Sequence, residues 1–378
     1  SAGAGTITFT STIGDTSNGP GVIGTTAVGN STTALMTFSS TDYTFDGATT
    51  FTAASNANID IAAAVEFTTA ADNITFATAN IELANQANLT VDTGAGAGNI
   101  TIGGSILGVS VETVTLDAGT GTTSVGVIGN AAEIGALSIG SAENGGITLN
   151  GAIVTDGAVT IDGPVTLATG AVSVTTGDNA LTFNHTIDGA QALTLVSGTA
   201  ATAVQGEIGG TTALSSLTAT NTTAAGTIEL TNIGGVTGAT AIGNTNTATI
   251  TLDGTAYSTA GTQTYTAAAG QNIDITGTAA TFTTTNDNIA FATAGVDLLN
   301  DSTTTINTGT VAGTVTFGGA IETAGGDDDL LVVTSGAGNV TFTGAIGATN
   351  ELGGLSVNAS AGAGTITFTS TIGATDNT

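Results

Sequence analysis

Hydrophobic and polar residues alternate along short segments of this chain. In residues 6–10, TITFT, the side chains of Ile7 and Phe9 fall on one face of an extended strand and three threonines fall on the other. Between residues 51 and 89 an apolar cluster recurs every seven to nine residues, at Phe51, Ile59, Phe67, Ile74, Ile81 and Leu89. No apolar stripe with a helical period is present, so the pattern predicts an all-β chain of short strands.

The strands are grouped into a repeating unit. The segments GTVTFGGAI (313–321), GNVTFTGAI (338–346) and GTITFTSTI (364–372) follow one another at spacings of 25 and 26 residues. Three apolar clusters fit into each unit, which predicts a three-sided parallel β-helix, a β-solenoid, with about 23–26 residues per coil. Parallel crossovers favour right-handed winding. The alternative is a string of Ig-like sandwiches, but the unit is too short for one and the chain has no Trp.

Two further repeats have periods much longer than one coil. The segment from Ser1 to Gly14, SAGAGTITFTSTIG, reappears unchanged from Ser360 to Gly373, an offset of 359 residues. In addition, the stretch that begins at Tyr43 resembles the stretch that begins at Tyr257, at an offset of 214 or 215 residues. We therefore predict that residues 1–378 form one continuous β-solenoid segment of a longer tandem array.

Asparagines stand directly before many of the predicted strands, at Asn58, Asn73, Asn80, Asn88 and Asn99. Asparagine tolerates left-handed backbone and its side chain bonds neighbouring backbone groups, so we expect these residues at the corners of the coils. Threonine, in contrast, is expected as the default residue on the solvent face of the strands.

The charge of the chain is one-sided. It has 29 acidic residues, no Lys or Arg, one His and no Cys, with charged residues at only 8% and a mean hydropathy of +0.37. The apolar content argues against disorder. Nucleic acid is excluded as a partner, because the chain has no basic Lys or Arg residues. Insertion into a membrane is excluded as well, because no run of 18 apolar residues is present. Divalent cations are the natural counterions, and the absence of Cys suits an exported bacterial chain.

Two units are typical of a known class of repeats: residues 338–373, GNVTFTGAIGATNELGGLSVNASAGAGTITFTSTIG, and residues 206–235, GEIGGTTALSSLTATNTTAAGTIELTNIGG. They resemble the β-strand repeats of large bacterial exoproteins of the filamentous-haemagglutinin type and of autotransporter passengers. The resemblance covers nearly the whole chain and is one of repeat style. It implies an extracellular β-helical shaft at the cell surface, and it carries over no active-site residue.

Few residues are candidates for chemistry. His185, with Asp188 three residues on, is the only possible centre of a catalytic triad, and it is expected instead as an outward or corner residue. Polysaccharide lyases need a cation such as Arg or Lys, which this chain lacks, and nothing breaks the repeat to form the cleft of a hydrolase. The densest acidic cluster is Asp327, Asp328 and Asp329, which we interpret as a solvated corner or, alternatively, as a weak Ca²⁺ site. Threonine arrays such as residues 262–266, TQTYT, have the local form of an ice-binding surface, but their position drifts along the sequence.

The sequence thus predicts a non-enzymatic structural protein that needs no cofactor: a stiff, protease-resistant shaft of an extracellular filament or surface fibre. Its expected partners are copies of itself, joined end to end or as a covalent tandem. The alternative is an adhesin stalk whose Thr, Asn and Asp surface binds glycans or a Ca²⁺-bridged matrix.

Overall fold

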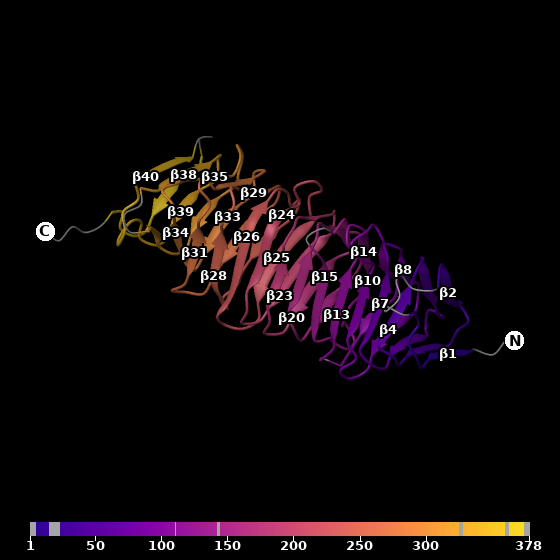
Figure 1. Cartoon of the computed structure of the whole chain (residues 1–378). Helices are drawn as coiled ribbons and strands as arrows, with labels where there is room; N and C mark the ends of the chain where they lie inside the picture. The colour runs from indigo at the N-terminus through magenta and orange to yellow at the C-terminus, as the bar shows by residue number, and fades with distance from the viewer. Residues whose placement is uncertain are drawn as a thin grey trace. The chain divides into compact units, whose positions relative to one another are not determined.

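The computed structural model describes residues 5–14, 23–109, 111–141, 144–324, 328–359 and 363–373. Its elements are β-strands, and none of these residues forms an α-helix. The strands are short, stack in parallel and make about 14 turns of a β-solenoid (Figure 1). The predicted fold class is therefore confirmed. The chain divides into two compact units, Ser1–His185 and Thr186–Thr378, which are described separately.

In the first unit every full coil visits three rows of strands in the same order. Row a contains β1 (Thr6–Phe9), β3 (Leu35–Phe38), β6 (Asn58–Ile61), β9 (Asn80–Leu83), β12 (Ile106–Leu107), β17 (Ile153–Thr155) and β20 (Val172–Thr176). Row b contains β4 (Asp42–Phe45), β7 (Val65–Thr69), β10 (Leu89–Asp92), β13 (Thr113–Asp117), β15 (Ala136–Gly140), β18 (Val159–Asp162) and β21 (Leu181–Phe183). Row c contains β2 (Thr26–Gly29), β5 (Thr49–Thr52), β8 (Ile74–Phe76), β11 (Ile100–Ile102), β14 (Thr122–Val125), β16 (Gly146–Leu149) and β19 (Val165–Leu167).

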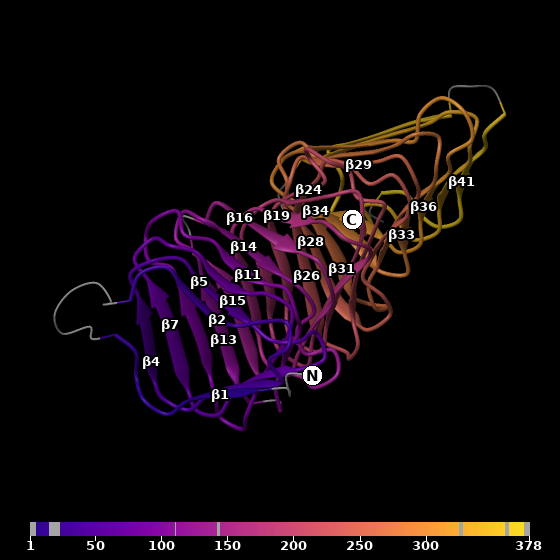
Figure 2. The same ribbon diagram turned by 90° about the vertical axis from the view of Figure 1, so that its right-hand side faces the viewer.

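The strands of each row pair in parallel with the strand one coil away. Within row b, Val65 lies opposite Leu89 and Leu89 lies opposite Val114, and the paired strands β4 and β7 run side by side in Figure 2. Within row a the single residue Ile128 bridges Ile106 and Ile153 where no full strand forms. Like residues therefore stack on like residues, because the repeat in the sequence is also the repeat of the coil.

The second unit has the same three-row plan. Row d contains β23 (Ala192–Ser197), β25 (Ser216–Asn221), β27 (Thr240–Ile242), β30 (Gln263–Thr266), β33 (Ile289–Ala292), β36 (Val315–Phe317), β39 (Val340–Phe342) and β41 (Ile366–Phe368). Row e contains β24 (Thr202–Ile208), β26 (Gly226–Ile233), β28 (Thr247–Leu252), β31 (Asn272–Ile275), β34 (Gly295–Leu298) and β37 (Ile321–Thr323). Row f contains β22 (Ile187–Asp188), β29 (Ala256–Thr259), β32 (Thr281–Thr284), β35 (Thr303–Asn307), β38 (Leu330–Ser335) and β40 (Gly354–Ala359).

The short repeat read from the sequence gives the register of row d. Val315 lies opposite Val340, which lies opposite Ile366, and the three phenylalanines two residues further on pair likewise. Their rings stack face to face, with centroids 5.1 Å apart for Phe317 and Phe342 and 4.9 Å apart for Phe342 and Phe368. The predicted spacings of 25 and 26 residues are thus confirmed as coil lengths.

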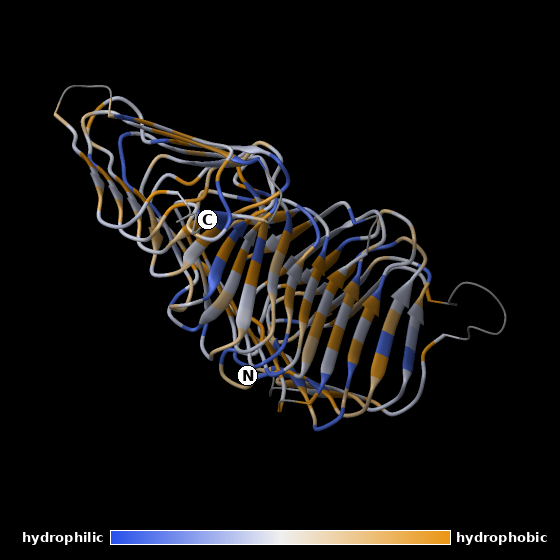
Figure 3. Ribbon diagram, turned by 90° about the vertical axis from the view of Figure 1, so that its left-hand side faces the viewer, coloured by the Kyte–Doolittle hydropathy of each residue, from blue (hydrophilic) through white to orange (hydrophobic). Residues whose placement is uncertain are grey.

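Each unit has a dry core of apolar side chains. Along the strands buried and half-exposed residues alternate, and Figure 3 shows the same alternation as bands of apolar and polar colour. The inward positions are filled mainly by Ile, Val, Leu, Phe and Ala, most of them fully buried. Burial of this apolar surface is the main stabilising term, since each Å² withdrawn from water stabilises the folded state by about 25 cal/mol.

Asn73, Asn88 and Asn99 lie at corners, as predicted, whereas Asn58 and Asn80 are the first residues of the strands β6 and β9. The Oδ1 atom of Asn73 accepts a hydrogen bond from the N–H of Asn99, one coil further on, at 2.8 Å. Asn80, Asn88 and Asn99 make the same bond to the next coil. None of these five asparagines has a positive φ, which falls instead two residues earlier, at Ala71 before Asn73 and at Gln86 before Asn88.

Threonine also has an inward role that the sequence reasoning missed. Hydroxyls at the ends of buried strands bond a backbone carbonyl a few residues on, as from Thr69 to Asp72 at 2.5 Å and from Thr93 to Gly98 at 2.9 Å. The same contact is made by Thr176, Ser197, Thr284, Thr308 and Ser335. These hydroxyls supply hydrogen-bond donors to the carbonyls of the corners.

Candidate functional site

The acidic cluster proposed as a Ca²⁺ site is only partly described, because Asp327 lies outside the described residues. Asp328 is exposed, and its N–H donates to Asp301 Oδ1 at 2.9 Å. The side chain of Asp329 is instead fully buried, and its Oδ1 accepts a hydrogen bond from the N–H of Ser302 at 2.7 Å. Asp329 therefore ties its coil to the coil before it. The Ca²⁺ site stays a prediction; among the described residues, no group of three or more His, Asp or Glu is placed to hold a metal ion.

A ladder of carboxylates runs across row e of the second unit. Asp274 lies opposite Asp297, and Asp297 lies opposite Glu322, each on the outward face of its strand. Burial raises the pKa of Asp297, and the neighbouring Glu322 raises it further. Burial likewise raises the pKa of Asp274, with a smaller contribution from Asp297. Like charges directly opposite one another destabilise a sheet, so this surface favours protonation.

Polar contacts hold the ladder in place. Asn272 Nδ2 donates to Asp297 Oδ2 at 2.7 Å. The carboxylate of Glu322 accepts hydrogen bonds from three successive backbone N–H groups, of which the shortest is 2.9 Å from Asn350. Sequence reasoning missed this ladder. Its signal is the outward acid at the same place in NIDI (272–275), GVDL (295–298) and AIET (320–323).

The first unit has a shorter version of the same ladder. Asp60 lies opposite Glu82 in row a, and burial raises the pKa of Asp60. Both acids line a cavity of about 220 Å³ together with the residues that follow them in their strands. On the next coil the column ends, because Leu107 lies opposite Glu82.

His185 lies on the surface of the first unit, as expected. Its Nε2 atom is 3.2 Å from Asp162 Oδ1, and the two side chains are 39% and 27% exposed. Asp188, which the sequence suggested as the partner of His185, makes other contacts: its Oδ1 accepts hydrogen bonds from the N–H groups of Thr211 and Thr212. His185 thus pairs with an aspartate of the preceding coil.

The outward threonines form columns. In row c, Thr50, Thr75, Thr101, Ser124, Thr148 and Thr166 lie opposite one another in that order. Single hydroxyl residues thus keep one place in this row although the coil length varies. β14 contributes a serine and the other five strands a threonine. The next outward position is Thr52 in β5, but in the strands that follow it is Ala77, Gly103, Gly126, Asn150 and Ala168. The two-threonine pattern of an ice-binding surface is therefore not repeated in this row.

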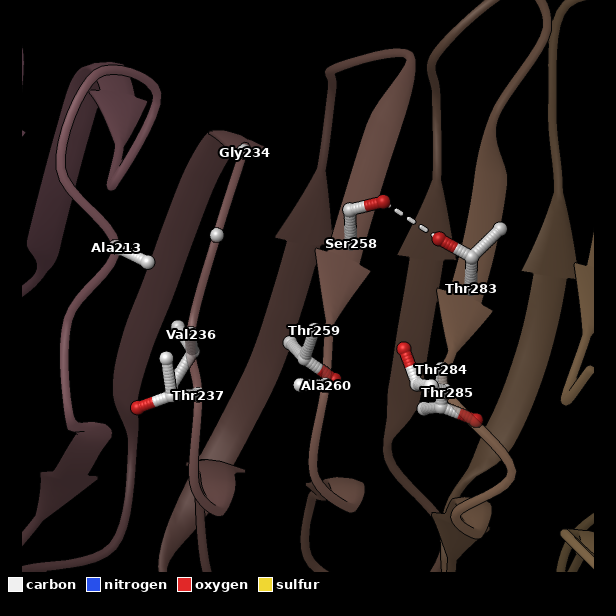
Figure 4. Close-up of a pocket in the computed structure, with 11 residues that line it drawn as sticks. Ala213, Gly234, Val236, Thr237, Ser258, Thr259, Ala260, Thr283, Thr284 and Thr285 are labelled. Atoms are coloured by element: carbon white, nitrogen blue, oxygen red, sulfur yellow. Dashed lines mark hydrogen bonds between the residues drawn. The ribbon is translucent and has the colours of Figure 1, made fainter.

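A depression in the second unit is lined by small residues and hydroxyls. It measures about 320 Å³ and lies over β29 and β32, between Thr237 and Thr285 (Figure 4). Within it the hydroxyls of Ser258 and Thr283 are 2.5 Å apart. Its lining contains Ala, Gly, Val, Ser and Thr only, so it offers hydrogen bonds to a polar ligand but no acid or base for proton transfer.

Comparison with protein-family models, with curated proteins and with solved structures finds no match to this chain. The β-solenoid fold therefore rests on the structure itself. Within the described residues no helix is long and apolar enough to cross a membrane.

Proposed function

We propose that this chain is a structural protein, a segment of an extracellular filament or bacterial surface fibre whose work is mechanical. The observation that carries the proposal is the repeated use of one coil plan within each unit. Strand pairs with strand, side chain stacks on like side chain, and corners are closed by Asn and Thr bonds. A coil repeated in this way resists local opening, because each strand is held on both edges.

The surface supports the same proposal. It carries acids and hydroxyls without Lys or Arg, so it repels other anionic surfaces and offers no cleavage site for trypsin. The repeat style of filamentous-haemagglutinin-type adhesins and autotransporter passengers is the reason for placing the protein outside the cell. Its partners are then further copies of the same array.

The test is digestion by a protease of broad specificity, combined with negative-stain imaging of the purified chain. We expect the folded chain to survive for hours under conditions that degrade the heat-unfolded chain within minutes, and to image as uniform rods or filaments. Degradation of the folded chain at the rate of the unfolded one would contradict the proposal.

The second candidate is an adhesin surface, favoured by the hydroxyl-lined depression and by the acidic cluster. Ca²⁺ bridging would then raise the Tm in a dose-dependent way, and Asp327→Ala together with Asp328→Ala would remove the increase. Asp329 is unsuitable for this test, because the loss of its bond to Ser302 lowers stability whether or not Ca²⁺ binds. A Tm unaffected by Ca²⁺ favours the inert shaft.

A further inference from the structure

The same ten residues, GTITFTSTIG, are seen in two different surroundings. At residues 5–14 they contain β1, which pairs with β3 of the coil that follows. At residues 364–373 they contain β41, which pairs with β39 of the coil that precedes. One sequence is thus observed once with a neighbour on its following side and once with a neighbour on its preceding side.

Outside the strand ladders, the two copies use different backbone groups for these contacts. The first copy uses the C=O groups of Gly5, Phe9 and Ile13 and the N–H of Ile13. The second copy uses the C=O groups of Thr365 and Thr371 and the N–H groups of Thr369 and Gly373, which correspond to positions 6, 12, 10 and 14. Because the two sets do not overlap, a single copy of the segment is able to bond a coil on each side at once.

The side chains are compatible with the same double use. Phe9 stacks on Phe38 with centroids 4.8 Å apart, and Phe368 stacks on Phe342 at 4.9 Å, each with the planes 5° apart. The ring of Phe368 remains 39% exposed, beside Ile366 at 40% and Ile372 at 56%. Phe9 stacks towards the following coil and Phe368 towards the preceding coil, so the phenylalanine at this position can stack on both sides at once.

We propose that the segment 364–373 is a joining coil, and that its partner is the β3 coil of a second copy of this chain. The register is the one that residues 5–14 already show: Thr365 opposite Leu35 of the second copy, Phe368 opposite its Phe38, and Ile372 opposite its Tyr43. The inference rests on the proposed fibre for its biological use, but its geometry is taken from the two copies alone.

In a second copy, β3 is already covered by that copy's own residues 5–14. When two chains join, residues 364–373 of one chain therefore take the place of residues 5–14 of the other. The incoming segment makes the contacts with β3 that the displaced segment loses. The exchange is close to neutral in contact energy, so a change in one copy of the segment tips the balance. Phe9 and Phe368, which occupy the same position in the two copies, are a matched pair with opposite expected effects.

The experiment compares the full-length Phe9→Ala and Phe368→Ala chains by sedimentation velocity over a concentration series. Phe9→Ala weakens the segment that must leave, and it should raise the head-to-tail association constant on the order of tenfold, since a stacked aromatic pair contributes about 0.5–1.5 kcal/mol beyond its buried area. Phe368→Ala weakens the arriving segment and should lower association below that of the unmodified chain. The double variant should lose the gain of Phe9→Ala.

The register is tested by disulfide formation, which is unambiguous because the chain has no Cys. A Thr367→Cys chain mixed with a Thr37→Cys chain should form a mixed disulfide dimer. The Thr8→Cys, Thr37→Cys double variant should form its disulfide within one chain and serves as the positive control.

Equal weakening by both Phe variants, or crosslinking of Thr367→Cys to a Thr8→Cys chain in place of Thr37→Cys, would mean that copies stack with both segments retained, and would overturn the exchange. Chains that stay monomeric in every variant and form no mixed disulfide would overturn it as well. Such chains, if still protease-resistant rods, would leave the shaft function standing.

Discussion

Two equivalent stretches, one in each unit, share a stacked aromatic pair but differ in the side chains of the neighbouring corner. Tyr43 stacks on Phe67 in the first unit, and Tyr257 stacks on Phe282 at the corresponding place in the second. The corner beside this stack differs. The first unit has Phe45, Thr49 and Phe51, and the second has Thr259, Gln263 and Tyr265. An aromatic corner has been replaced by a polar one on the same backbone plan.

The polar corner is fully bonded. Gln263 Nε2 donates to the carbonyls of Tyr257 and Thr283, both at 2.8 Å, and Gln263 Oε1 accepts from the hydroxyl of Tyr265 at 3.1 Å. Burial raises the pKa of Tyr265 well above its usual value, so the hydroxyl remains a neutral donor. At this corner the buried polar residues act as a group, because a lone buried polar atom is costly.

The largest effect is expected from removing the centre of the polar corner. Gln263→Ala removes the side chain that bonds the Tyr265 hydroxyl and the two carbonyls, and should lower the free energy of unfolding by about 2–4 kcal/mol. Thr49→Ala, at the equivalent place, should cost about 1 kcal/mol, since it removes a single bond to the Gly47 carbonyl. Urea unfolding followed by tyrosine fluorescence measures both, and equal costs would contradict the comparison.

A second set of changes introduces the polar corner of the second unit into the first unit, first as one residue and then as all three. Phe51→Tyr alone buries an unpaired hydroxyl in the first unit and should cost about 2 kcal/mol. The triple change Phe45→Thr, Thr49→Gln and Phe51→Tyr supplies the partners and should recover at least half of that loss. If the triple variant is less stable than Phe51→Tyr alone, the three residues do not act as a group. A double-mutant analysis of the unfolding curves separates these outcomes.

A third change should affect both stretches alike. Asn73 and Asn288 occupy equivalent corners, and the Oδ1 of each accepts an N–H from the next coil, from Asn99 at 2.8 Å and from Thr314 at 2.9 Å. Substitution by Ala should cost about 1 kcal/mol at either position. Substitution by Asp retains the acceptor and should cost less, which separates the bond from the size of the side chain. Unfolding of the four variants gives the comparison.

The smallest effect concerns the acidic ladders, with two acids in the first stretch and three in the second. Because the pKa values of Asp274 and Asp297 are raised in the folded chain, the folded state binds protons more readily than the unfolded state. Their stabilising contribution is therefore present below the pKa of the unfolded carboxyl and is lost as the pH rises through the raised pKa. The Tm should increase on acidification from neutral pH towards about pH 4.

Asp297→Asn removes the middle charge of the ladder. It should raise stability at pH 7 by about 0.2–1 kcal/mol and flatten the dependence of Tm on pH. The control Asp46→Asn removes an equal charge at an exposed corner of the first unit and should leave that dependence unchanged. A loss of stability in Asp297→Asn at pH 7 would show that the bond from Asn272 outweighs the repulsion.

The coil was predictable because two of its periods can be read directly in the sequence. These are the alternation of apolar and polar residues along a strand and the spacing of equivalent residues such as Phe317, Phe342 and Phe368. The corner position of Asn73 followed from its place before a strand, whereas its bond to the next coil did not. Other features depend on register, which the sequence does not state when coil lengths vary. The column from Thr50 to Thr166 spans coils of unequal length, so it is not evident in the sequence. The opposition of Asp297 to Glu322 and the burial of Asp329 likewise become visible only once the strands are aligned.

The central claim is that residues one coil apart are nearer in space than residues one corner apart. Nitroxide labels on Thr90→Cys and Thr115→Cys place one label on each of two paired strands, about 4.8 Å apart along the stack. Labels on Thr90→Cys and Thr101→Cys are closer in sequence but lie on different rows. Continuous-wave EPR of the frozen chain should show strong dipolar broadening for the first pair and weak broadening for the second. Broadening of the second pair alone would contradict the parallel coil.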